Sequence, residues 1–284
     1  MPNTPPRIES FRAPGGPELA YRHFAPTCEP RATVVLLHGI ISHSGWYGAS
    51  ASYLAERGFD VFALDRRGSG LNAERRGDID RWRTWVNDVV AFCETRRGAG
   101  PIVLLGISWG GKLAPVIARD RPDLIAGFGM ICPGIFARQQ PGIAKRSALM
   151  ATKPLGIDEP RVAIPLQAPD LFTNSSKWQA YIKDDPLTLR EITLRFARED
   201  HHLTRYARQS PRFIHLPTLL VLAGQDRMVL NGRTRAYLAE VASPDKTLLE
   251  YHTAAHTLEF EPDPEPFFDD LGDWIKRVVR RSYS

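Results

Sequence analysis

Ser108 is a candidate nucleophile, because residues 106–110 read GISWG and match the pattern G-x-S-x-G. The apolar run Pro101 to Leu105 precedes this motif, and a helical pattern follows it. Glycine two residues before and two after the serine permits a sharp turn, since no Cβ atoms collide there. Such a turn presents the serine at the carboxyl end of a strand and places the N–H of Trp109 at a helix N-terminus, where it can stabilise an oxyanion. The alternative is a chance match in a glycine-rich turn.

A serine nucleophile needs a general base, and the base needs an acid that orients it. In a strand–turn–helix arrangement we expect the acid and the base to follow the serine in the chain, with the acid before the base. Asp226 is the predicted acid, because it follows the buried run Thr218 to Ala223. His256 is the predicted base, because it lies in the loop after the next strand candidate, Lys246 to Tyr251. The weaker alternatives are His252, which belongs to the strand end, and Glu259 and Asp245, which close no buried strand.

A second oxyanion donor should come from the loop after the apolar run Ala32 to Leu37. This loop begins His38-Gly39-Ile40, and a His-Gly step lets the backbone turn an N–H toward the serine. We assign Ile40 as that donor beside Trp109. His38 is interpreted as a structural residue that holds the loop, not as a second base.

The elements that must position these residues alternate between strand and helix. Short apolar runs closed by Gly, Asp or His are typical of strands covered on both faces. The predicted strands are Ala32–Leu37, Phe59–Leu64, Pro101–Leu105 and Leu219–Ala223. The predicted helices are Ser50–Arg57, Arg81–Arg97, Trp109–Arg119, Asn231–Val241 and Phe267–Arg280. The alternation indicates an α/β fold with a mostly parallel sheet, and Ile8 to Phe24 adds a hairpin that turns at Gly15-Gly16.

The alternation stops between residues 134 and 213, where prolines recur and no buried strand stands out. We interpret this stretch as a helical cap or lid inserted into the core, which then comprises residues 1–133 and 214–284. Within it, Leu187 to Ala197 is predicted to be helical. His201 and His202 are adjacent and do not share a helix face, so a metal site there is not expected. For eight apolar residues of the cap there are two alternatives, to line an acyl pocket or to form the cap's own core: Ile143, Leu149, Met150, Leu155, Ile164, Leu166, Leu171 and Phe172.

The composition fits a folded globular protein, since 43% of the 284 residues are hydrophobic and 24% are charged. The net charge of +5 comes from arginines scattered among acidic residues, so no nucleic-acid partner is expected. The three cysteines, Cys28, Cys93 and Cys132, form no disulfide framework or metal spacing. The polar, proline-rich N-terminus and the absence of an apolar run of about 18 residues favour a cytoplasmic location.

Further motifs resemble those of the α/β-hydrolase superfamily, and of its monoacylglycerol lipase and lysophospholipase branch, and they follow one another along the chain in the same order. They are Leu36-Leu37-His38-Gly39, His43-Ser44-Gly45-Trp46-Tyr47, Leu54 to Val61, Asp65-Arg66-Arg67-Gly68-Ser69-Gly70, and Arg75 to Asp80 before the Trp85 helix. The resemblance spans about residues 8 to 280 and is weakest in the cap. It implies a mostly parallel eight-stranded sheet flanked by helices, and a serine hydrolase of lipid-like carboxylic esters. It also implies the nucleophile Ser108, the acid Asp226, the base His256 and the oxyanion donors Ile40 and Trp109, with no metal or organic cofactor.

The chain departs from that branch where histidine and methionine usually flank the serine, since Ile107 and Trp109 stand there. It also has Gly68-Ser69-Gly70 in place of Gly-His-Gly. We expect the larger Trp109 side chain to narrow the acyl pocket. The same triad would serve an acyltransferase, a thioesterase, a peptidase or a ligand-binding receptor with little turnover. Transient membrane contact through the cap, the oligomeric state and the acyl chain length stay open at this point.

Overall fold

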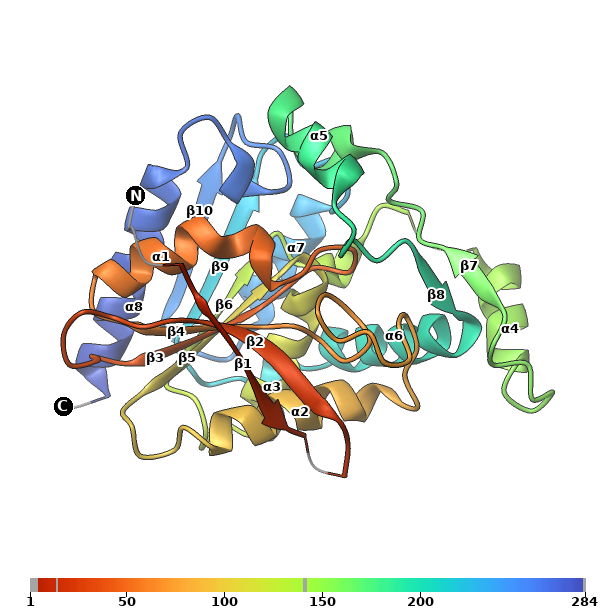
Figure 1. Ribbon diagram of the computed structural model, residues 1–284, viewed down its shortest axis with the longest axis horizontal. Helices are drawn as coiled ribbons and strands as arrows, with labels where there is room; N and C mark the ends of the chain where they lie inside the picture. The colour runs from red at the N-terminus through yellow and green to blue at the C-terminus, as the bar shows by residue number, and fades with distance from the viewer. Residues whose placement is uncertain (1–4, 14, 140–141, 283–284) are drawn as a thin grey trace.

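Figure 1 shows the computed structural model, which describes residues 5–13, 15–139 and 142–282. Its centre is one eight-stranded sheet with the order β1-β2-β4-β3-β5-β6-β9-β10. The strands are β1 (Arg7–Arg12), β2 (Glu18–Phe24), β3 (Thr33–Leu37), β4 (Asp60–Leu64), β5 (Ile102–Ile107), β6 (Gly127–Ile131), β9 (Thr218–Ala223) and β10 (Lys246–Tyr251). The hairpin β1–β2 is antiparallel and pairs antiparallel with β4, whereas all pairs from β4 to β10 are parallel. The predicted sheet is therefore confirmed.

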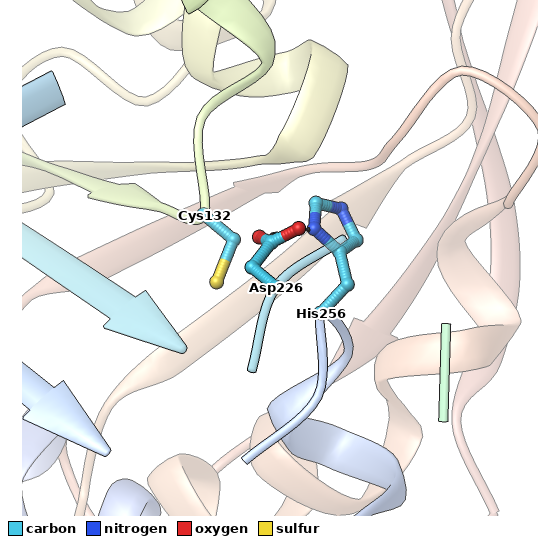
Figure 2. Close-up of side chains that lie close together, drawn as sticks. All are labelled: Cys132, Asp226 and His256. Atoms are coloured by element: carbon cyan, nitrogen blue, oxygen red, sulfur yellow. Dashed lines mark hydrogen bonds and ion pairs between the residues drawn. The ribbon is translucent and has the colours of Figure 1, made fainter. Parts of the chain in front are cut away.

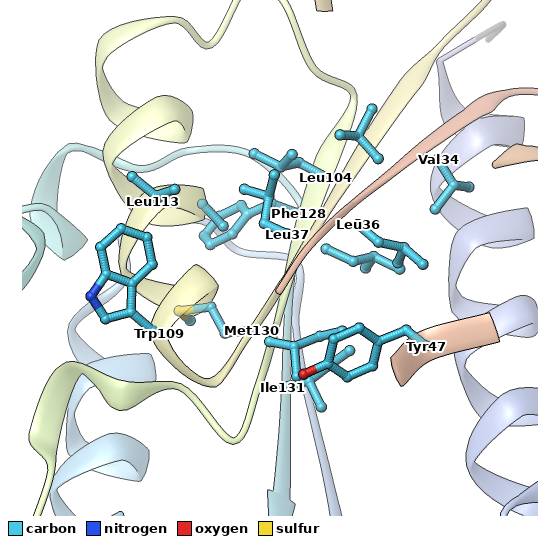
Figure 3. Close-up of a cluster of buried hydrophobic side chains, with 14 of the residues drawn as sticks. Val34, Leu36, Leu37, Tyr47, Leu104, Trp109, Leu113, Phe128, Met130 and Ile131 are labelled. Carbon is cyan, nitrogen blue, oxygen red and sulfur yellow. The ribbon is translucent and has the colours of Figure 1, made fainter. Parts of the chain in front are cut away.

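The five central strands are buried along almost their whole length because helices cover both faces of the sheet. In Figure 3, Val34 and Tyr47 lie on one side of the strands, and Leu113 and Trp109 lie on the other. Burial of this much apolar surface is the main source of stability in such a core.

Helices α1 and α8 pack together on one face of the sheet, and α2 and α3 pack together on the other (Figure 1). The core helices are α1 (Gly48–Glu56), α2 (Trp82–Glu94), α3 (Leu113–Asp120), α7 (Asn231–Glu240) and α8 (Glu265–Arg281). One predicted start is wrong: the helix expected from Trp109 begins at Leu113, because the 3-10 helix η2 (Ser108–Lys112) forms first. That tight turn lets the chain leave β5 sharply.

Strand β6 is missing from the sequence prediction. Two of its five residues, Gly127 and Gly129, have no side chain and so weaken the apolar pattern. Packing explains the second of these glycines, since a Cβ at Gly129 would lie 2.7 Å from Cδ2 of Leu105. The strand is therefore built from small residues where its neighbour's side chain needs the space.

Residues 134–213, called the inserted segment below, connect the neighbouring strands β6 and β9 and lie to the right in Figure 1. Its elements are η3 (Gly134–Phe136), α4 (Ile143–Ala151), β7 (Arg161–Ala163), η4 (Pro169–Leu171), α5 (Ser176–Asp184), β8 (Glu191–Thr193), α6 (Leu194–Arg208) and η5 (Pro211–Phe213). Its longest elements are the helices α4, α5 and α6, as expected, but β7 and β8 add a small antiparallel sheet.

The helix predicted over Leu187 to Ala197 is wrong in its first half. Glu191 to Thr193 pair with β7, and the Oγ1 of Thr193 accepts the N–H of Phe196 at 3.0 Å, which caps α6. Strand pairing and the cap together delay the helix to Leu194.

The eight apolar residues predicted for an acyl pocket or a cap core differ in burial, and four are half-buried: Leu149, Met150, Leu166 and Leu171. Ile164 and Phe172 are buried, whereas Ile143 and Leu155 are 76% and 68% exposed and belong to neither a core nor an enclosed pocket. Within the described ranges, no helix is both long and apolar enough to span a membrane.

Candidate active site

Ser108 stands at the turn between β5 and η2, with its backbone in the left-handed region at φ +52°. Non-glycine residues rarely adopt this conformation, and it is common at strained functional turns. Glycine is required on both sides of the turn: a Cβ on Gly106 would lie 2.5 Å from the oxygen of Gly110, and one on Gly110 would lie 2.2 Å from the oxygen of Leu37. The sequence motif thus has a steric cause.

The structure brings the three residues predicted as a triad into one chain of hydrogen bonds. Nε2 of His256 lies 2.9 Å from Oγ of Ser108, and Nδ1 of His256 lies 2.7 Å from Oδ2 of Asp226. Asp226 follows β9, and His256 lies in the loop between β10 and the 3-10 helix η6 (Leu258–Phe260). Figure 2 shows the carboxylate of Asp226 facing the imidazole ring of His256. This geometry lets the ring accept a proton from the serine while the carboxylate holds the ring in place.

Asp226 is held as a charged carboxylate. Burial raises its pKa, but the nearby His256 and the hydrogen bonds from His256 and from the N–H groups of Met228 and Val229 outweigh burial and lower the pKa below its ordinary value. Those N–H groups lie 2.7 and 3.0 Å from Oδ1. One oxygen is therefore fixed by the backbone, and the other is directed at the imidazole.

The alternative acids and base do not take part in this arrangement. His252 is exposed at the end of β10, and Asp245 forms an ion pair with Arg277 at 3.5 Å. Glu259 is buried, but its Oε1 accepts the N–H of Ser50 at the start of α1, at 2.9 Å.

The loop after β3 runs directly beside the serine, since a Cβ on Gly39 would lie 3.3 Å from Cβ of Ser108. His38 is buried, which lowers its pKa well below the ordinary value and keeps the ring neutral. Its Nε2 accepts the N–H of Arg66 at 2.9 Å, so the ring proton lies on Nδ1, which is 2.7 Å from the oxygen of Gly39. His38 therefore holds the loop and has no contact with Ser108 among the hydrogen bonds of the described residues.

The indole of Trp109 is 3% exposed and lies on the same side of the sheet as Leu113 (Figure 3). Its ring centroid lies 4.8 Å from that of Trp85 on α2, and its Nε1 donates to Oδ1 of Asp200 on α6 at 2.6 Å. Lys112 donates to the same oxygen at 2.6 Å. Trp109 thus links the serine turn to the inserted segment.

Cys132 lies directly beside the triad. Its Sγ and the ligand atoms of Asp226 and His256 all lie within 4.8 Å of one another (Figure 2). Burial, followed by the charge of Asp226, raises the pKa of the thiol well above its ordinary value. Metal ions bind the thiolate, so a thiol held neutral beside an already paired carboxylate does not favour a metal ion here.

Two further residues near the site had no recognisable signal in the sequence. Arg66 stands in a motif that the sequence assigned only to a family resemblance, and Asp185 lies in the inserted segment, 142 residues from its partner His43. Only the fold brings them beside the loop after β3.

The comparisons with known proteins show which family the chain resembles. The family model described as serine aminopeptidase, S33, matches residues 28–263. Human monoglyceride lipase is 30% identical over 271 residues, which cover 92% of this chain and 88% of that protein. Monoacylglycerol lipase of Mycolicibacterium smegmatis is 27% identical over 270 residues, or 94% of this chain and 95% of that protein. The crystal structure of Paleococcus ferrophilus monoacylglycerol lipase has a TM-score of 0.82 at 24% identity, covering 93% of this chain and 99% of that one, and shows the shared fold.

Proposed function

The chain belongs to the serine aminopeptidase S33 family of α/β-hydrolases, and from this premise we propose that it hydrolyses carboxylic esters of lipid-like alcohols. The observation that carries the proposal is the hydrogen-bonded chain from Ser108 through His256 to Asp226. The relatives named monoglyceride or monoacylglycerol lipase support a lipid-like ester as the substrate.

In the proposed reaction, Oγ of Ser108 attacks the ester carbonyl carbon while Nε2 of His256 takes its proton. Asp226 fixes the ring tautomer and stabilises the imidazolium. The tetrahedral intermediate collapses, the carbon–oxygen bond to the alcohol breaks, and His256 returns the proton to the departing alcohol. Water then attacks the acyl-enzyme by the same route and releases the acid.

The N–H groups of Ile40 and Trp109 are the proposed donors to the oxyanion. Ile40 follows Gly39, which lies against Ser108, and Trp109 follows Ser108 directly at the start of η2. Removing one donor of this kind typically costs about 3 kcal/mol of transition-state stabilisation. These donors, the triad and a water molecule complete the reaction without a metal or an organic cofactor.

We further propose that the inserted segment is the cap that forms the substrate walls and makes transient contact with lipid surfaces. Four exposed apolar side chains support that contact: Ile143, Leu155, Ile157 and Val162. The cytoplasmic location stays a prediction.

Initial rates on p-nitrophenyl esters from acetyl to palmitoyl, and on a monoacylglycerol, test the proposal. Ser108→Ala should fold normally and lose at least about 10³-fold in kcat, whereas Ser147→Ala, an exposed serine on α4, should match the wild type. An added alcohol acceptor separates hydrolysis from acyl transfer, and an aminoacyl p-nitroanilide detects peptidase activity. A folded wild type without ester turnover, or a Ser108→Ala variant with full turnover, would overturn the assignment.

A further inference from the structure

We propose that Arg66 is the positioning residue of the oxyanion hole, and that its guanidinium holds the peptide of Ile40 in the orientation that the reaction needs. The inference rests on the proposed function, because it concerns how the same reaction is accelerated. Arg66 follows β4 and lies outside the triad and outside the two proposed donors.

The guanidinium of Arg66 binds the backbone of the loop that carries Ile40. Nη1 donates to the oxygen of Gly39 at 3.1 Å, and Nη2 donates to the oxygen of Ile40 at 2.9 Å. Nη2 also lies 3.3 Å from Oγ of Ser69. The planar guanidinium thus holds two successive carbonyl groups of one loop from a single side chain.

These contacts fix the direction of the Ile40 N–H. The C=O of Gly39 and the N–H of Ile40 belong to one planar trans peptide, so they point in opposite directions. The oxygen of Gly39 receives hydrogen bonds from Arg66 and from Nδ1 of His38. The N–H of Ile40 is therefore directed away from Arg66, and it donates no hydrogen bond to any of the described residues. A free, oriented N–H beside Ser108 is what an oxyanion requires.

The same guanidinium also contacts the residue that carries the other proposed donor. Its Cζ lies 4.4 Å from the centre of the Trp109 ring, which is a cation–π distance. Arg66 therefore joins both halves of the oxyanion hole: it binds the carbonyls of one half by hydrogen bonds and stacks on the side chain of the other.

Burial of the Arg66 guanidinium costs free energy, which argues against a role in stabilising the fold as a whole. Arg66 is only 9% exposed, and its Nε has no hydrogen-bond partner within the described part of the chain. Its Nη atoms donate to carbonyl and hydroxyl oxygens and form no carboxylate salt bridge within 4.0 Å among the described residues. Burying a cation on neutral acceptors is unfavourable compared with pairing it or leaving it in water. We infer that the buried Arg66 serves to fix the geometry of the loop that carries Ile40.

The neighbouring Arg67 provides a matched control. Its Nε and Nη2 bind both oxygens of Asp88 at 2.9 and 2.6 Å, and none of its hydrogen bonds in the described structure reaches the loop of Ile40. Replacing Arg67 removes a partly buried arginine at the next position and leaves the oxyanion loop in place.

The test compares wild type, Arg66→Met, Arg66→Lys and Arg67→Met on p-nitrophenyl butyrate, with active-site titration to count functional enzyme. For both Arg66 variants we expect kcat to fall by roughly 10- to 100-fold and KM to change by less than about 3-fold, because the interaction acts in the transition state. Lysine cannot replace arginine, since one ammonium does not span two carbonyls. Arg67→Met should stay close to wild type. If Arg66→Met does not fold, Arg66→Lys carries the test by the same criteria.

A second readout separates positioning from a structural role. An alkyl trifluoromethyl ketone adds to the serine and places an oxyanion in the hole, so its Ki should rise by the same factor as kcat/KM falls. A folded Arg66 variant with unchanged kcat, or with lower kcat and unchanged Ki, would overturn the inference. If the wild type hydrolysed no ester, the proposed function would fail by itself. The dissociation constant of the ketone, measured by titration calorimetry, needs only its addition to Ser108 and would still decide on Arg66.

Discussion

Asp185 of the inserted segment and His43 of the loop after β3 form a buried hydrogen bond, with Oδ2 of Asp185 lying 2.8 Å from Nε2 of His43. The same oxygen accepts Nε1 of Trp46 at 2.8 Å. Four residues beyond Asp185, the N–H of Leu189 donates to the oxygen of Ile41 at 2.9 Å. The inserted segment is thus fastened to the loop that carries the proposed donor Ile40.

Asp185→Asn should weaken this attachment. Burial raises the pKa of Asp185, but the hydrogen bonds from His43 and Trp46 outweigh it and lower the pKa below its ordinary value. The carboxylate therefore stabilises the fold above its unfolded-state pKa, and that contribution is lost as the pH falls. At pH 7 we expect the free energy of unfolding to drop by about 1–3 kcal/mol and kcat/KM to drop by about 10-fold. Chemical denaturation and initial rates measure the two effects.

Asp184→Asn is the control for this variant, because Asp184 is the exposed neighbour at the end of α5. It should leave the unfolding free energy and kcat/KM near the wild-type values. An Asp185→Asn variant with unchanged kcat/KM would show that the attachment of the inserted segment has no influence on the reaction.

The sequence predicts the strands of the core well because they are continuous apolar runs, and it predicts the serine turn because sterics restrict it to glycine. It misses β6, where Gly127 and Gly129 interrupt the apolar pattern and Gly129 makes room for Leu105. It also places the start of α6 too early, because pairing of Glu191 to Thr193 with β7 is a contact between distant segments.

Local sequence patterns do not predict the residues that surround the triad. The serine, acid and histidine each follow a strand of the sheet, where position along the chain indicates a role. Arg66 and Asp185 act through partners brought together by the fold: Arg66 reaches the loop of Gly39 from the next strand, and Asp185 reaches His43 across 142 residues. One sequence contains no signal for such contacts.

Glu259 should make the stability of the protein fall between weakly acidic and neutral pH. Burial raises its pKa from 4.5 to about 7, although Oε1 accepts the N–H of Ser50. The folded state then holds this proton more tightly than the unfolded state, so the free energy of unfolding decreases as pH rises from about 4.5 to about 7. Glu259→Gln is neutral throughout and should lack this part of the decline. At pH 8 the variant should exceed the wild type by on the order of 3 kcal/mol.

Denaturation midpoints measured from pH 4.5 to pH 8 check this expectation. Glu265→Gln removes an exposed carboxylate at the start of α8 and should keep the wild-type pH profile. Identical profiles for Glu259→Gln and the wild type would mean that Glu259 ionises in the fold without a penalty.

Trp109→Met should shift the substrate preference toward longer acyl chains. The indole fills space between Trp85 and Phe196, with ring centroids 4.8 and 6.2 Å away, and its Nε1 bonds Asp200 on α6. Methionine is smaller, flexible and without a donor, so it frees volume beside the serine turn and loosens the contact with α6. The ratio of kcat/KM for p-nitrophenyl palmitate to that for p-nitrophenyl butyrate should rise by about 5- to 50-fold, since each added methylene contact is worth roughly 0.8 kcal/mol.

The control for the Trp109 variant is Trp82→Met, which removes an indole on α2 that packs against Tyr206 at a centroid distance of 5.0 Å. It should leave the palmitate-to-butyrate ratio unchanged, because Trp82 has no contact with the serine turn among the aromatic contacts of the described residues. A Trp109→Met variant that lowers both rates equally would show that the indole only supports the turn. A selective rise for palmitate would instead identify Trp109 as the residue that limits acyl chain length.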